Sequence, residues 1–206
     1  MKNTYKNNIS GATLFEIIIT VAILALVINV VAAFSADVFR FSGTIYNSVQ
    51  AQQDARNILR QLAFELRTTS PSNIGAYALA ETSANRIRFY SDIDGDGLKE
   101  EVIYFLSADG RTLYKNIRKP SGAPLQYTGS FSTSTIANDI VNGATPLFTY
   151  YDTNYDGTSA PLTQPVNILS VRLVRIEVII ERDPNRAPIP INVSTQVSLR
   201  NLKDNL

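Results

Sequence analysis

The pattern of hydrophobic and polar positions sets apart the first part of the chain. Ala12 to Phe34 is almost continuously apolar, with Glu16 as its one charged residue. At about 1.5 Å per residue, a helix of this length crosses the ~30 Å hydrocarbon core of a bilayer. Lys2 and Lys6 precede it and Asp37 is the next acid after Glu16. The pattern therefore predicts a transmembrane helix over 12–34, with the N-terminus in the cytoplasm by the positive-inside rule.

An ordinary secretory signal is the competing interpretation of this segment. Ala32 to Ala36 offers small residues of the kind that signal cleavage needs. Such signals have a shorter apolar region, and here a helical pattern continues directly from it. The length and the continuation favour an anchored helix.

Apolar residues then recur at steps of three or four, which predicts that the helix continues over 35–70. Thr68 to Pro71 ends the pattern with a stop signal. We expect the apolar face of this amphipathic part to lie on a globular domain, and Asp54, Glu65 and the arginines between them to face water. The apolar positions are Val38, Phe41, Ile45, Val49, Ile58, Leu59, Leu62 and Leu66.

We expect residues 71–206 to form a β-rich globular head outside the cytoplasm, because the chain from Arg86 onward has the alternation typical of strands. The predicted strands are 86–90 and 101–106, which form a hairpin, then 112–119, 146–151, 171–182 and 191–202. Within 171–182 the alternation slips at Val174-Arg175. Residues 120–146 read as a loop-rich insertion with a modest strand signal at 125–131. A helix followed by strands predicts an α+β fold, in which an antiparallel sheet packs on the helix that leaves the membrane.

Composition removes several classes of function. The chain has 206 residues and a net charge of +1, which is too balanced for a general nucleic-acid binder. It contains no His, Cys or Trp, which excludes the commonest zinc sites, thiol nucleophiles and Ser-His-Asp triads. No other catalytic arrangement is visible, so we expect a protein that is not an enzyme.

One acidic loop resembles the first half of a calcium-binding loop. Asp92, Asp94 and Asp96 stand at places one, three and five, followed by a glycine at place six. The carbonyl of Leu98 and the side chain of Glu100 would complete a candidate calcium site. The closing Glu of an EF-hand is absent, and the alternative is a turn whose carboxylates face water. The loop with Asp152, Asn154 and Asp156 repeats the spacing with the same two interpretations.

The start of the chain resembles the type IV prepilin signature. Gly11 follows a short basic leader, Ala12-Thr13-Leu14-Phe15 is mostly apolar, and Glu16 holds the fifth place. In that family a prepilin peptidase cuts after the Gly and methylates the new N-terminus. The resemblance implies a cleaved leader over 1–11, a mature chain that starts at Ala12, and a pilin fold.

Parts of the head are similar to minor pilins of the PilW type and to the J-type pseudopilin of type II secretion. The similar segments are 147–152, the strand that begins at Val171, and 198–202. The resemblance implies a minor subunit that primes or caps a type IV pilus or a secretion or competence pseudopilus. It also implies partners, namely prepilin peptidase, major and minor pilin-like subunits and an inner-membrane assembly platform. The chain would begin in the bacterial inner membrane and end in the filament or at the cell surface.

In this interpretation the Glu16 carboxylate pairs with the N-terminal amine of a neighbouring subunit, because each charge would otherwise face hydrocarbon. The alternative for Glu16 is a side chain that reaches the membrane interface. The alternative for the whole chain is a membrane-anchored protein that displays a calcium-dependent binding head and never polymerises. A filament subunit that binds DNA would need a basic stripe, and none is visible in the sequence.

Overall fold

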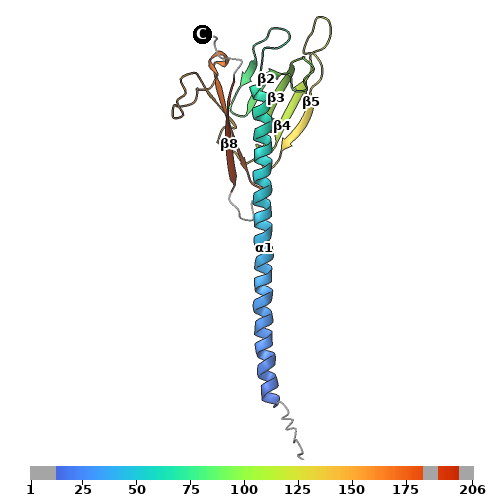
Figure 1. Ribbon diagram of the computed structural model, residues 1–206, viewed down its shortest axis with the longest axis vertical. Coiled ribbons are helices and arrows are strands. Elements are labelled where there is room, and N and C mark those ends of the chain that lie inside the picture. Colours follow the sequence, from blue (N-terminus) through green and yellow to red (C-terminus); the bar gives the residue numbers. More distant parts are fainter. Residues whose placement is uncertain (1–12, 183–189, 200–206) are drawn as a thin grey trace, which may run out of the picture. The chain divides into compact units, whose positions relative to one another are not determined.

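A computed structural model describes residues 13–182 and 190–199 of the chain. The chain divides into two compact units, Met1–Tyr46 and Asn47–Leu206. The helix α1, Leu14–Arg67, begins in the first unit and ends in the second (Figure 1). The predicted helix is thereby confirmed, with its C-terminal end one residue before the Thr68 stop signal.

The first part of α1 is apolar and exposed. Every side chain from Leu14 to Phe34 is exposed to solvent in the described protein. Within the described residues, α1 is the one helix that is long and apolar enough to cross a membrane, by its length and composition. Among the described residues of its own unit, nothing covers the apolar surface of this segment.

The last part of α1 packs into the head, but the contact begins later than the pattern predicts. Val38, Phe41, Ile45 and Val49 are all exposed. The buried face starts at Ala51 and includes three alanines that a search for large apolar residues overlooks. Its members are Ala51, Ala55, Ile58, Leu59, Leu62, Ala63, Glu65 and Leu66.

Five strands form an antiparallel sheet in the order β1-β2-β3-β4-β5. The predicted hairpin and third strand are confirmed, since β2 and β3 pair from Arg86↔Phe105 to Ser91↔Glu100. The short β1 was not predicted. The strand signal at 125–131 was misplaced, because β5 lies later. The bounds are β1 Leu79–Thr82, β2 Arg86–Ser91, β3 Glu100–Leu106, β4 Leu113–Arg118 and β5 Ser132–Ala137.

Three further strands form a second antiparallel sheet in the order β6-β7-β8. The bounds are β6 Phe148–Tyr151, β7 Leu173–Ile180 and β8 Ile191–Ser198, with a short 3-10 helix η1, Ile168–Ser170, before β7. Burial alternates along β7 without interruption, with Val174 on the buried face and Leu173 on the other. The slip expected at Val174-Arg175 is therefore wrong, because the strand begins at Leu173 rather than at Val171.

The two sheets share one core with the end of α1. A single cluster of buried side chains includes Leu62 and Leu66 of α1, Phe89 and Tyr104 of the first sheet, and Ile176 of the second. The fold of the described residues is therefore α+β. The head contains two sheets rather than the single sheet that the strand pattern suggested.

Hydrogen bonds to the β1–β2 turn also join the two sheets. The Phe148 amide donates to the Ala84 carbonyl at 2.9 Å, and the Tyr150 hydroxyl donates to the Ser83 carbonyl at 2.8 Å. The β1–β2 turn is thus held against β6.

Candidate functional site

The predicted processing residues Gly11 and Ala12 lie outside the described residues. Glu16 is described, in the first turn of α1, and its side chain is exposed. Its Oε2 accepts a hydrogen bond from the Thr13 amide at 3.4 Å, and its own amide donates to Thr13 Oγ1 at 3.4 Å. This reciprocal pair is a capping box, which satisfies two amides at the helix start. The carboxylate therefore has a role within its own chain that the sequence analysis overlooked.

The acidic loop connects β2 to β3 and is folded around Asp92. Asp92 Oδ1 accepts from the Gly95 amide at 2.8 Å, and Oδ2 accepts from the Gly97 amide at 3.0 Å. Gly95 and Gly97 have φ of +77° and +90°, which L side chains rarely adopt. The two glycines allow the loop to turn back so that its carboxylates approach one another.

Three of the five candidate calcium ligands come together. Asp92, Asp94 and Glu100 each place one carboxylate oxygen within 4.8 Å of the other two. Asp96 instead accepts a hydrogen bond from the Leu98 amide at 2.8 Å. The acidic side chains that the fold gathers are therefore those of Asp92, Asp94 and Glu100.

A lysine that the sequence analysis did not single out contacts this cluster. Lys119, which follows β4, forms an ion pair with Asp94 and another with Asp96 at 2.8 Å. Its ammonium also lies 3.8 Å from Glu100 Oε1. The hydrogen bonds to Asp94 and Asp96 raise the pKa of Lys119 above its usual range, and the bond from Lys119 lowers the pKa of Asp96. One ammonium thus neutralises part of a dense negative charge.

Glu100 is the buried member of the cluster. Its residue is fully excluded from solvent, and Oε2 accepts from the Ile93 amide at 3.0 Å. Oε1 is buried and has no hydrogen-bond partner among the described residues. Burial raises the pKa of the Glu100 carboxyl, and the nearby Asp94 raises it further.

The second acidic loop is held by its own backbone. Asp152 accepts from the Asn154 amide at 2.9 Å, and Asp156 accepts from the Thr158 and Ser159 amides, each at 2.8 Å. These bonds lower the pKa of Asp156 to about 2. The geometry is that of local turns in which the carboxylates cap backbone amides.

The prediction that Glu65 lies on the solvated face of the helix is wrong. Glu65 is buried, and its Oε1 accepts from Lys115 Nζ of β4 at 2.6 Å. Its Oε2 accepts from the Tyr104 hydroxyl of β3 at 2.9 Å. Burial and the Glu65 charge together raise the pKa of Tyr104. The group is a link between α1 and the first sheet, and only the tertiary fold brings its members together.

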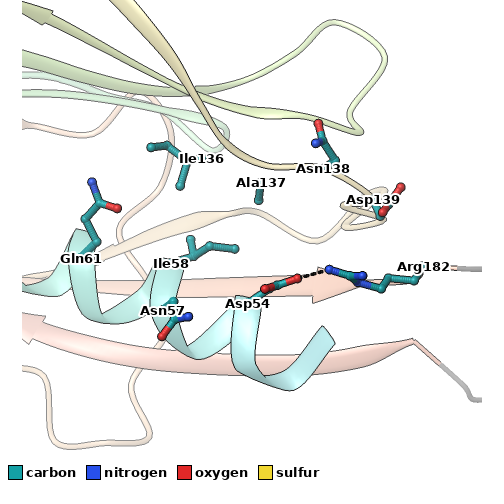
Figure 2. A pocket seen from close by; sticks show the side chains of 9 residues that line it. All are labelled: Asp54, Asn57, Ile58, Gln61, Ile136, Ala137, Asn138, Asp139 and Arg182. Carbon is teal, nitrogen blue, oxygen red and sulfur yellow. Dashed lines mark hydrogen bonds and ion pairs between the residues drawn. The ribbon is translucent and has the colours of Figure 1, made fainter. Parts of the chain in front are cut away.

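A groove of about 420 Å³ lies between α1 on one side and the end of β5, the two residues after it and Arg182 on the other. Figure 2 shows Asp54 of α1 joined to Arg182 at one end of it. The Arg182 guanidinium is already paired with Asp54. The lining residues are Asp54, Asn57, Ile58, Gln61, Ile136, Ala137, Asn138, Asp139 and Arg182. This arrangement carries no recognisable chemistry of its own.

Comparison of the chain with protein-family models and with curated proteins gives no match.

Proposed function

We propose that this chain is a pilin-like subunit, a minor pilin or pseudopilin that helps to prime or cap a type IV pilus or a secretion or competence pseudopilus. One observation carries the proposal. The exposed apolar part of α1 directly follows the pattern from Gly11 to Glu16, which resembles a prepilin cleavage signature. An apolar helix surface that stays exposed to water is unfavourable, and lipid or other apolar helices would cover it.

The head supports the same proposal. Antiparallel sheets pack on the last turns of the helix whose first turns are apolar, as in a pilin fold. One continuous element would thus connect the buried core of a filament to an exposed surface domain. The work of such a subunit is mechanical and requires no catalytic group.

The proposal implies a sequence of partners. Prepilin peptidase would remove residues 1–11 and methylate Ala12 at the inner membrane. The assembly platform and other pilin-like subunits would then receive the helix. Glu16 would pair with the N-terminal amine of a neighbour and set the axial register, because two opposite charges in hydrocarbon compensate each other.

The second candidate is a membrane-anchored binding protein whose head binds calcium and which does not polymerise. The convergence of Asp92, Asp94 and Glu100 favours it. Processing separates the two candidates, because only the first requires cleavage after Gly11.

The test is co-expression of the full chain with a prepilin peptidase, followed by mass spectrometry of the N-terminus. Wild type should yield a chain that starts at Ala12, and Gly11→Leu should stay at full length because a bulky side chain blocks approach to the peptide bond. Gly43→Leu is the matched control, since a Cβ at Gly43 meets no atom within 4 Å. It should be processed like wild type.

Failure of wild type to be cut would overturn the proposal in favour of the anchored binding protein. A mature Ala12 terminus from Gly11→Leu would also overturn it, because the cut would then not depend on the signature.

A further inference from the structure

The β2–β3 loop contains a buried carboxylate oxygen that nothing in the described protein satisfies by a hydrogen bond. Glu100 is fully buried, and its Oε1 lacks a hydrogen-bond partner. An uncompensated buried carboxylate is costly, and such groups in native proteins usually face a cation, a proton or water. Among the described residues, the cation paired with this oxygen is the Lys119 ammonium, whose 3.8 Å separation is an ion pair without a hydrogen bond.

The carboxylates around this oxygen have the arrangement of a cation site. Asp92, Asp94 and Glu100 converge within 4.8 Å of one another. Repulsion among three such charges requires a counter-charge nearby. Lys119 supplies one positive charge through its contacts with Asp94 and Asp96, and Lys99 lies 3.6 Å from Asp92 Oδ2.

Lys119 is suited to leave the cluster. Half of its side chain is exposed, and its flexible stem joins a compact ammonium to the end of β4. The carboxylates, in contrast, are held in place. Asp92 accepts hydrogen bonds from two backbone amides of its own loop. The backbone next to Glu100 is also fixed, because the Lys99 amide donates a hydrogen bond to Asn73 Oδ1 at 2.6 Å.

We propose that Asp92, Asp94 and Glu100 bind a calcium ion, and that Lys119 is the internal cation that occupies this cluster until calcium displaces it. The inference does not rest on the proposed filament function.

Calcium fits the donor set better than other ions. All three donors are carboxylates, which suit hard cations and not the soft or borderline ions that prefer nitrogen and sulfur. Calcium accepts irregular geometry and fills its remaining positions with water and carbonyl oxygens, whereas magnesium demands a near-ideal octahedron. The loop contains Gly95 and Gly97, and its Asp94 is exposed, so a bound ion would have an irregular protein geometry and access to water, which calcium tolerates.

The experiment is calorimetric titration of the full chain, purified in detergent and freed of metal by chelator, with calcium chloride. Wild type should bind one calcium ion with a dissociation constant of about 10⁻⁴ to 10⁻³ M, the range of extracellular modules. Lys119→Gln should bind about tenfold more tightly, because the competing ammonium is gone and the negative charge remains.

Two variants remove a ligand charge. Glu100→Gln should weaken binding by at least about tenfold, and Asp94→Asn, which alters an exposed residue and spares the core, should do the same. Asp152→Asn, in the second acidic loop, is the matched control and should bind as wild type. A parallel titration with magnesium chloride should give much weaker binding.

Absence of binding by wild type up to about 10 mM calcium would overturn the inference, even if Lys119→Gln binds, since the lysine would then be the permanent cation. Equal affinity for magnesium, or unchanged affinity in both Glu100→Gln and Asp94→Asn, would also overturn it.

Discussion

Glu16, Glu65 and Glu100 are the same side chain in three different surroundings. Glu16 is exposed and caps the start of α1 through Thr13. Glu65 is buried and accepts hydrogen bonds from Lys115 and Tyr104, whereas Glu100 is buried with one oxygen that no described residue reaches by a hydrogen bond. The chemistry of each carboxylate follows from how many donors reach it and how much water is excluded.

Glu16 can be tested so that its capping role is separated from its charge. Glu16→Gln keeps an oxygen that can accept from the Thr13 amide but removes the charge, and Glu16→Ala removes both. If Glu16 pairs with a neighbour's amine, recruitment into filaments should fall strongly in both variants. The measurement is co-purification with co-expressed pilin-like subunits.

Asp37→Asn serves as the control, because Asp37 is another exposed acid of α1 and should incorporate normally. Normal incorporation of Glu16→Gln together with loss in Glu16→Ala would leave capping as the whole role of Glu16.

At the scale of elements, the attachment of α1 to the first sheet combines an apolar face with one buried ion pair. Leu62 and Leu66 of α1 are part of the buried core, and Glu65 between them in the sequence pairs with Lys115. Hydrophobic burial supplies most of the attraction, and the ion pair adds a geometric requirement. A buried pair contributes little net stability, whereas the loss of one partner strands a charge.

The Glu65–Lys115 pair allows a quantitative prediction about the stability of the head. Glu65→Gln and Lys115→Met should each lower the free energy of unfolding of the head by about 3 kcal/mol, because each leaves an uncompensated buried charge. The double variant removes both charges and keeps an acceptor for the Tyr104 hydroxyl, so it should cost less than about 1.5 kcal/mol. Denaturant unfolding followed by near-ultraviolet circular dichroism measures all three. Additive losses in the double variant would show that the two residues are not coupled.

At the scale of the whole molecule, the buried core belongs to one of the two compact units. Every member of the buried cluster lies at Ala51 or later, in the unit Asn47–Leu206. The first unit contributes exposed apolar helix. This division separates an exposed apolar helix from the part that folds around its own core.

The division predicts the outcome of truncation. A chain that starts at Asn47 should unfold cooperatively, with a free energy of unfolding within about 1 kcal/mol of that of the head in the full chain, because no buried side chain is lost. A chain that starts at Arg60 lacks Ile58 and Leu59, each worth about 2 to 5 kcal/mol when buried, and should lose cooperative unfolding. Thermal unfolding followed by circular dichroism compares the two. A disordered chain from Asn47 would place essential contacts in the first unit.

Local patterns sufficed for the elements that bury one face. The sequence predicted the helix α1 and the strands β2, β3, β4, β6, β7 and β8. Buried residues recur every three or four positions in a helix and every two in a strand, so the order of apolar residues along the chain indicates such elements. Strand β5 was not predicted, because its Ser and Thr side chains are largely exposed and give no alternating apolar pattern. Its backbone pairing with β4 holds it in the sheet. Strand β1 is too short for its alternation to be recognised.

The sequence by itself determined a long apolar helix near the N-terminus, a β-rich head, and an acidic loop with regularly spaced carboxylates. The tertiary structure alone decided that the strands divide into two sheets, that Glu65 is buried beside Lys115, and that Lys119 meets Asp94. The reason is physical. The spacing of apolar residues depends only on residues that are near one another in the sequence. The partner of a charged side chain depends on which distant element the fold brings within a few ångströms of it.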